Sequence, residues 1–358
     1  MLRKILPALA VLLGVTALAA EASLAQPAAA PEAGTPASCG PPVLADKAGL
    51  KPVAGSHLMT VPVEINGAPK QFLLALGSDP DEIAEAAADE LHLQRIDRST
   101  ISNAKGLQGS EMQFQPRFLD VTGADVKSAQ AGVRAQTFTL GGATLHGMPL
   151  LISSDRDLGK AKPYDGLLTA GGFRNYDIAL DFAGGALSFL APSGCADPNR
   201  IVTWPHAAVA VIPVTLAGGK IGVPVMIEGH RIDAVLDTAS DHSVMRRAVA
   251  ERLFGFKAGT AEMMADSGLR DGAGGRVYRH TFPEVALEGV VARNVPMLIQ
   301  VSSMVRKARR APTTGSRLQA DDDAGEPVPD LTLGMDVLSQ LHLYIAFGQN
   351  RIFATPAG

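Results

Sequence analysis

Ala234-Val235-Leu236-Asp237-Thr238-Ala239-Ser240 is the stretch that decides the fold of this 358-residue chain, because it is the second copy of a repeat. The first copy lies 162 residues earlier and reads Leu73-Leu74-Ala75-Leu76-Gly77-Ser78 at the corresponding positions. Without gaps, the match extends from residues 61–91 onto residues 223–253. A carboxylate in one copy therefore corresponds to a methyl group in the other.

Two further blocks of the chain repeat in the same order. Residues 140–152 align onto residues 287–299, and residues 165–169 align onto residues 330–334. Three blocks in a conserved order indicate a duplication rather than a chance motif. The sequence thus predicts two homologous lobes, lobe 1 over 44–195 and lobe 2 over 205–356, joined by a turn-rich linker over 196–204.

The pattern within each lobe favours short strands over helices. Apolar runs end at glycine and resume after two to four residues, as they do in β-hairpins. Short helical stretches are expected over 82–91 and 244–253, and a second short helix is expected after Asp165 and Asp330. We therefore expect a mostly β fold, in which each lobe is a small β-barrel-like unit.

The N-terminal residues have the composition of a targeting segment. Arg3 and Lys4 precede an apolar run over 5–20, and small residues follow. This pattern predicts a signal peptide over 1–25 and a disordered Pro/Ala-rich lead-in over 26–43. An uncleaved anchor is the alternative, although the run is short of the ~20 apolar residues of a membrane span. We expect a periplasmic or secreted protein, and the Ala- and Gly-rich composition favours the periplasm.

The chain has two cysteines, Cys39 and Cys195, which flank lobe 1. In an oxidising compartment such an isolated pair is a candidate disulfide. A bridge would join the entry of the lobe to its exit, and two free thiols are the alternative.

Charge and ligand spacing give no sign of nucleic acid, metal or cofactor. The net charge of −4 supplies no basic surface for nucleic acid or anionic lipid. None of the histidines shows the spacing of a metal site. We expect no metal, no cofactor, and no membrane association once the signal peptide has been cleaved.

An apolar strand that ends in Asp237-Thr238-Ala239-Ser240, followed later by Leu331-Thr332-Leu333-Gly334, resembles the aspartic peptidase superfamily. The similarity is greatest to bacterial retropepsin-like and pepsin-like proteins with two tandem lobes. It implies a pepsin-like bilobed arrangement, in which both lobes contribute a loop to a central cleft. It also implies that Asp237 is catalytic, Thr238 braces its loop, Ser240 hydrogen-bonds the carboxylate and Gly334 packs beneath the loop.

The family's reaction needs two carboxylates that share one proton. One takes a proton from water while the other donates to the scissile carbonyl, without a metal or a covalent intermediate. Lobe 1 departs from this pattern, with Ala75 at the Asp position, Leu76 at the Thr position and Thr169 at the Gly position, although it retains Ser78. Asp79, Asp81 and Glu82 follow closely, but none is placed to replace the missing acid.

Two functions from different classes are compatible with these residues. The first is an exported aspartic endopeptidase-like protein that acts on extended polypeptide with reduced activity, because one catalytic Asp is kept. The alternative is a non-catalytic pseudopeptidase that still binds peptide in the cleft between the lobes.

The same residues bear on assembly and on two loops. A monomer is expected because the linked lobe 1 occupies the surface on which a second lobe 2 would pair. A lobe 2 homodimer is the alternative.

The charged insertion over 305–326 is interpreted as a solvated loop or a docking segment. Gly268 to Gly275 is interpreted as a surface hairpin or as a flap, with Tyr278 covering the cleft.

Overall fold

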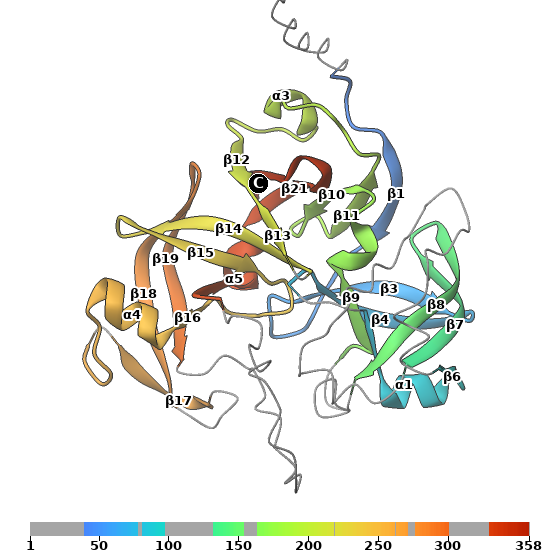
Figure 1. Cartoon of the computed structure of the whole chain (residues 1–358), viewed down its shortest axis with the longest axis horizontal. Coiled ribbons are helices and arrows are strands. Elements are labelled where there is room, and N and C mark those ends of the chain that lie inside the picture. Colours follow the sequence, from blue (N-terminus) through green and yellow to red (C-terminus); the bar gives the residue numbers. More distant parts are fainter. Residues whose placement is uncertain are drawn as a thin grey trace, which may run out of the picture. The chain divides into compact units, whose positions relative to one another are not determined.

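Two closed rings of hydrogen-bonded strands, one in each half of the chain, form the frame on which the repeat is displayed (Figure 1). This computed structural model describes residues 39–77, 81–96, 132–153, 163–217, 219–261, 263–270, 276–300 and 329–357. The predicted signal peptide, lead-in residues 26–38, Ser78 and the insertion over 305–326 lie outside the described residues.

In the first half, one sheet has the strand order β2-β3-β4-β9-β5-β8-β7-β6. An additional pairing of β3 with β7 closes six of these strands into a ring. The strands are β2 Lys51–Pro52, β3 Met59–Ile65, β4 Ala68–Ala75, β5 Glu82–Ala84, β6 Gln94–Ile96, β7 Gly132–Leu140, β8 Ala143–Ser153 and β9 Gly166–Thr169.

The second half repeats this topology strand for strand. Its sheet has the order β13-β14-β15-β20-β16-β19-β18-β17, and an additional pairing of β14 with β18 closes the ring. The strands are β13 Thr215–Ala217, β14 Lys220–Ile227, β15 His230–Leu236, β16 Val244–Arg246, β17 Met264–Arg270, β18 Arg276–Leu287, β19 Val290–Gln300 and β20 Leu331–Leu333. The predicted fold class, a mostly β protein with two retropepsin-like lobes, is confirmed.

A third sheet, which the sequence did not predict, takes strands from both halves in the order β1-β11-β10-β21-β22-β12. The two halves meet where β10 pairs with β21, for example at Leu180 and Leu343. The strands are β1 Leu44–Gly49, β10 Asp177–Asp181, β11 Ala186–Leu190, β12 Ala210–Pro213, β21 Leu341–Ala346 and β22 Arg351–Pro356. Residues Ser38–Gly358 accordingly form one compact unit.

Equivalent tight turns set the register of the first hairpin in each lobe. Asn66 and Gly67 have φ angles of 53° and 81°, and Glu228 and Gly229 have φ angles of 47° and 82°. Two consecutive residues with positive φ match the twist of the flanking strands, so two-residue hairpins favour them. Alternate residues of β3 and β14, such as Val61 and Val223, then point into the core.

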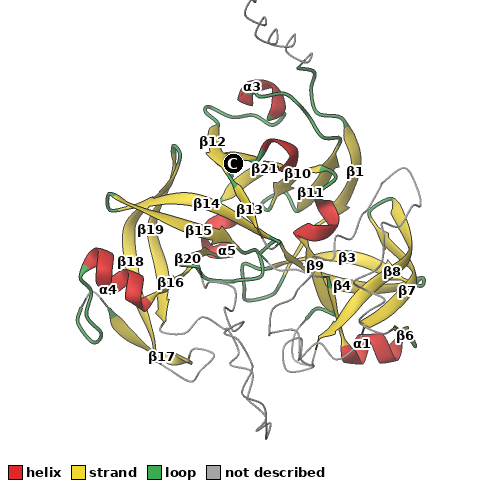
Figure 2. Ribbon diagram, viewed as in Figure 1, coloured by secondary structure: helices red, strands yellow, loops and turns green. Residues whose placement is uncertain are grey.

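The helices are short and begin later than the sequence predicts. Residues 82–84 and 244–246 are strands that pair within the rings, and the helices α1 Glu85–Glu90 and α4 Arg247–Phe254 follow them (Figure 2). The sequence favours helix because these positions are mostly good helix formers, but ring closure requires their backbone groups for the sheet. The remaining helices are η2 Ala170–Phe173, α3 Pro198–Ile201, α5 Met335–Leu338 and η3 Phe347–Gln349.

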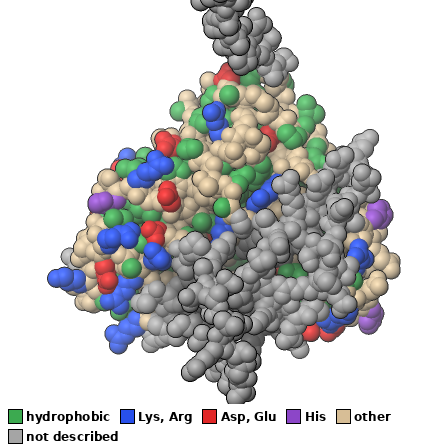
Figure 3. Space-filling view, in the orientation of Figure 1, with side chains coloured by type: hydrophobic (Ala, Val, Ile, Leu, Met, Phe, Trp, Pro, Cys, Tyr) green, Lys and Arg blue, Asp and Glu red, His purple; other side chains and the backbone are tan. Residues whose placement is uncertain are grey.

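A disulfide joins Cys39 to Cys195, the isolated pair that flanks lobe 1. It fixes the start of β1 beside the segment that follows β11. Among the described residues no helix is both long and apolar enough to cross a membrane. On the face shown in Figure 3, Lys and Arg side chains are interspersed with Asp and Glu over the described surface.

Candidate functional site

Asp237 lies directly after β15, in a loop that hydrogen bonds hold in place. Its backbone N–H donates to the carbonyl of Leu333 at 3.0 Å, which ties the loop to β20. Its carboxylate Oδ1 accepts the N–H of Ala239 at 2.9 Å. These hydrogen bonds give the side chain of Asp237 a fixed orientation, even though the residue is partly exposed to solvent.

Burial raises the pKa of the Asp237 carboxyl above its ordinary value. The Ala239 N–H and the positive charge of Lys220 act in the opposite direction and lower it. Desolvation disfavours the charged form of a carboxyl group, whereas donors and cations favour it. The carboxyl group thus retains a proton to higher pH than an exposed Asp does.

Thr238 fastens the Asp237 loop to the equivalent loop of lobe 1. Its hydroxyl accepts the N–H of Leu76 at 2.9 Å and donates to the carbonyl of Leu74 at 2.7 Å. The residue is 2% exposed, so water does not compete for these bonds. This is the bracing position that the family resemblance implies for Thr238.

Gly77 lies against the carboxylate from the other lobe. A Cβ atom added at Gly77 would lie 2.7 Å from Cβ of Asp237 and 2.8 Å from its Cγ. Such distances are below any real contact of a Cβ atom, so the approach requires glycine. The backbone of lobe 1 therefore contributes to the desolvation of Asp237.

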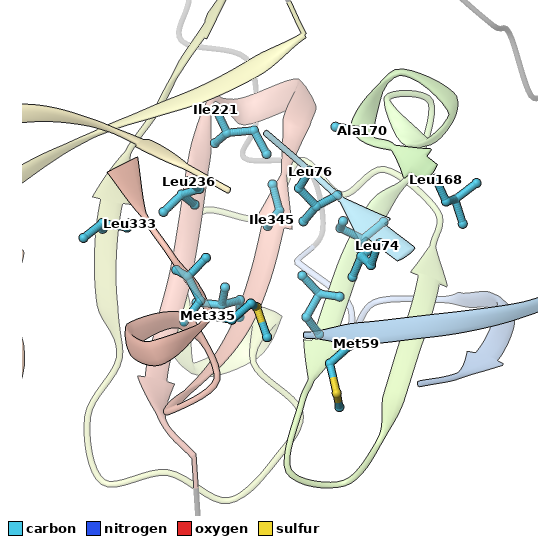
Figure 4. Close-up of a cluster of buried hydrophobic side chains, with 14 of the residues drawn as sticks. Met59, Leu74, Leu76, Leu168, Ala170, Ile221, Leu236, Leu333, Met335 and Ile345 are labelled. Carbon is cyan, nitrogen blue, oxygen red and sulfur yellow. The ribbon is translucent and has the colours of Figure 1, made fainter. Parts of the chain in front are cut away.

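The rest of the lobe 1 loop is apolar and buried. Ala75 is 0% exposed and pairs with Thr169 at the end of β4. Leu76 packs into the core that Leu74, Leu236 and Met335 share (Figure 4). No carboxylate stands at the lobe 1 position that corresponds to Asp237.

The two lobes support their loops with different chemistry. In lobe 2 the N–H of Gly334 donates to the hydroxyl of Ser243 at 3.0 Å. In lobe 1 the N–H and the hydroxyl of Thr169 donate to Oδ1 of Asp81 at 2.7 and 3.0 Å. Asp81 is 7% exposed and is the repeat mate of Ser243. Its supporting role was missed, although that alignment offered the signal for it.

Gly334 packs beneath the Asp237 loop, where the resemblance implies a glycine. A Cβ atom there would overlap the carbonyl group of His242 and lie 2.8 Å from the carbonyl oxygen of Ser240. The predicted hydrogen bond from Ser240 to the Asp237 carboxylate is wrong. The Ser240 hydroxyl donates instead to the carbonyl of His242 at 2.8 Å, because the loop turns back on itself there.

A second contact between the lobes lies four residues beyond Asp237. Oδ1 of Asp241 accepts the hydroxyl of Ser56 at 2.9 Å and the N–H of His57 at 2.7 Å. Partial burial raises the pKa of Asp241, but these two donors and the imidazoles of His57 and His242 hold it below the ordinary value. This contact has no signal in the sequence, because Ser56 and Asp241 lie 185 residues apart.

The remaining candidates are not assembled into a site. Tyr278 is 7% exposed, and the guanidinium carbon of Arg247 lies 5.8 Å from the centre of the tyrosine ring. Residues 271–275 of the predicted flap and Asp79 lie outside the described residues. Within the described part of the chain, no group of three His, Cys, Asp or Glu side chains could hold a metal ion.

Residues 223–337 match the family model described as aspartyl protease, and this range contains Asp237, Thr238 and Gly334. This part of lobe 2 is therefore similar to the aspartyl protease family. The match begins in β14 and ends in α5, so it spans the strands that position Asp237.

Among solved structures, the chain is similar to basic 7S globulin from soybean at 12% identity and a TM-score of 0.43, over 88% of this chain and 96% of that one. Conglutin gamma from lupine seeds matches at 11% identity and a TM-score of 0.41, over 88% and 95%. A retropepsin-like aspartic protease from Rickettsia conorii matches at 12% identity and a TM-score of 0.27, over 41% of this chain and 92% of that one. No curated protein matches the chain.

Proposed function

We propose that this protein binds extended polypeptide at the Asp237 loop and does not hydrolyse it. The observation that carries the proposal is that Thr238 still joins the loops of the two lobes although the second acid is missing. Thr238 still joins the two loops, yet Ala75 is buried at the position of the second carboxylate. The fold of an aspartic peptidase is kept while the proton-sharing pair is lost.

A single carboxylate is insufficient for the family's chemistry. The reaction needs one group to accept a proton from water while a second, protonated group donates to the carbonyl oxygen. Asp237 alone cannot be protonated and ionised at once. It can still accept hydrogen bonds from peptide N–H groups, and such main-chain bonds are a recurring basis of peptide recognition.

Slow hydrolysis by Asp237 is the second candidate, and the preserved geometry of lobe 2 favours it. The Asp237 carboxylate is oriented by Ala239, and its loop is supported by Gly334 and Ser243. A carboxylate held in this way could act as a general base toward water without its partner. Any such activity would depend on Asp237.

Cleavage and binding of an unfolded, fluorescently labelled polypeptide, measured from pH 3 to pH 8, separate the two candidates. Wild type is compared with Asp237→Asn, and with Asp233→Asn as a matched control on the exposed face of the same strand. We expect binding without products, and about 10-fold weaker binding for Asp237→Asn alone, since a hydrogen bond to a charged group contributes ~1.5–3 kcal/mol.

Products that form with wild type and Asp233→Asn, but not with Asp237→Asn, would overturn the non-hydrolytic proposal in favour of the second candidate. The absence of both binding and cleavage would contradict both candidates.

We further propose that the chain is exported, to the periplasm or beyond, and acts as a monomer. The Cys39–Cys195 disulfide and the basic and apolar residues that open the sequence support export. The contacts of Thr238 with lobe 1 support a monomer, because lobe 1 occupies the surface on which a second lobe 2 would pair. Fractionation of the producing cells and light scattering of the purified protein test these two points.

A further inference from the structure

The hairpin that carries Asp237 places a lysine across from it. In the pairing of β14 with β15, Ile221 lies opposite Leu236. Lys220 and Asp237 each lie one residue beyond this last pair, Lys220 at the start of β14 and Asp237 just past the end of β15. Residues next to a directly opposed pair remain neighbours across the two strands.

Lobe 1 has the same hairpin with an apolar pair at these positions. Thr60 and Leu73 are the last pair of β3 with β4, and Leu58 and Ala75 each lie two residues beyond it. Leu58 packs against the core, and Ala75 is fully buried. The two lobes therefore differ at both positions. Lobe 2 has lysine and aspartate there, whereas lobe 1 has leucine and alanine.

We propose that Lys220 is the electrostatic partner of Asp237, and that this ammonium–carboxylate pair replaces the two-carboxylate pair as the polar centre of the site. Lys220 is a positioning residue in this scheme, since it acts through the ionisation of Asp237. At the matching positions of lobe 1, Leu58 and Ala75 supply neither a cation nor a carboxylate.

The other elements around Asp237 bring it little charge. Lobe 1 contributes the backbone of Gly77, and β20 contributes Leu333. The Asp237 loop itself carries Asp241 and His242, which face Ser56, His57 and Asp336. Among the described residues, Lys220 is the charged group that acts on the Asp237 carboxyl, and it lowers the pKa against the effect of burial.

The consequence of this pairing for peptide binding rests on the proposed function. An ionised Asp237 accepts hydrogen bonds and donates none. It would therefore bind peptide N–H groups and leave the carbonyl groups of the ligand to other donors. The pairing itself is testable without any ligand, so it can fail or stand independently of peptide binding.

The test is a carbon-13 NMR titration of the Asp237 carboxyl in the full chain, with the signal assigned by its loss in Asp237→Asn. Lys220→Met removes the cation and Lys220→Arg keeps it. Lys257→Met removes an exposed cation from the same lobe as the matched control. A nearby opposite charge lowers a carboxyl pKa substantially, so we expect Lys220→Met to raise the proton affinity of Asp237 about 10-fold. Lys220→Arg and Lys257→Met should leave it within about 2-fold.

An unchanged proton affinity in Lys220→Met, or an equal rise in Lys257→Met, would overturn the pairing. Lys220→Gln serves as the second cation-free variant should the methionine variant not fold, and the same two outcomes apply to it.

Discussion

The hydroxyl of Thr238 accepts a hydrogen bond at 2.9 Å from the backbone N–H of Leu76. Leu76 is the residue of lobe 1 that corresponds to Thr238 in the repeat. The contact is one-sided, because leucine has no hydroxyl to return it. Half of a symmetric junction therefore holds the two loops together. The consequences of this asymmetry can be measured.

Replacing Thr238 with valine keeps its shape and removes its hydroxyl. The N–H of Leu76 and the carbonyl of Leu74 would then be buried without their partner. Each unsatisfied buried group costs ~1–3 kcal/mol, so we expect a loss of about 2–6 kcal/mol in the free energy of unfolding, measured in urea. Thr238→Ser retains the hydroxyl and should lose much less; equal losses in the two variants would mean that the hydrogen bonds contribute nothing.

Gly334→Ala tests the close packing beneath the Asp237 loop. The added methyl group would overlap the carbonyl of His242, and relief requires a shift of the loop. Overpacking of this kind costs about 1–3 kcal/mol, which thermal unfolding would detect. Gly222→Ala is the matched control, because the nearest atom to its added Cβ is the carbonyl oxygen of Thr215 at 3.4 Å. A control that loses as much stability as Gly334→Ala would contradict the steric argument.

Loss of the Cys39–Cys195 disulfide should destabilise the protein strongly. The bridge closes a loop of 156 residues, and loops of this length give the largest constraint on the unfolded chain. We expect Cys39→Ser with Cys195→Ser to lower the free energy of unfolding by about 3–5 kcal/mol. Reductant should lower the stability of wild type to that of the variant and leave the variant unchanged. Insensitivity of wild type to reductant would show that the bridge is absent in solution.

The pH dependence of stability should differ in sign between Asp237 and Asp241. Burial raises the pKa of folded Asp237, so its contribution to stability is present below the unfolded value and is lost as the pH rises through the folded value. Asp237→Asn should therefore gain stability relative to wild type between pH 3 and pH 7. The measurement is urea unfolding at each pH.

Asp241→Asn is the contrasting variant in that series. The donors from Ser56 and His57 hold the pKa of Asp241 below its ordinary value, so its contribution is present at neutral pH and is lost in acid. The variant should be less stable than wild type at pH 7, with a deficit that shrinks toward pH 2. Parallel curves for the two variants would contradict at least one of the two assignments.

Restoring the second carboxylate should create peptidase activity. Ala75→Asp with Thr169→Gly returns the acid and the small residue under its loop, at a cost in stability because Ala75 is buried. A positioned acid or base contributes about 10²–10⁴-fold to a rate, so we expect at least 100-fold more cleavage than in wild type at acidic pH. Ala75→Asn with Thr169→Gly matches the size without the carboxylate. Activity that is equal in both, or that survives Asp237→Asn, would contradict the two-carboxylate requirement.

The sequence predicts much of the architecture, because duplication gives each strand an independent second observation. Val61 and Val223, or Leu74 and Leu236, report the same buried positions twice, so the alternation of strand residues is readable without a structure. Helix limits were less predictable, since β5 and β16 pair with strands that lie far away in sequence. The third sheet was missed because the pairing of Leu180 with Leu343 has no local signal.

The sequence by itself determined that this chain has two related lobes, that Asp237 lies in one of them and that Ala75 replaces its counterpart. These facts follow from the order of residues along the repeat. Only the tertiary structure decided that Gly77 lies against the Asp237 carboxylate, that Asp241 holds Ser56, and that Ser240 turns away to His242. Such contacts depend on the distances between loops, and those distances are fixed by the packing of whole strands rather than by any short segment.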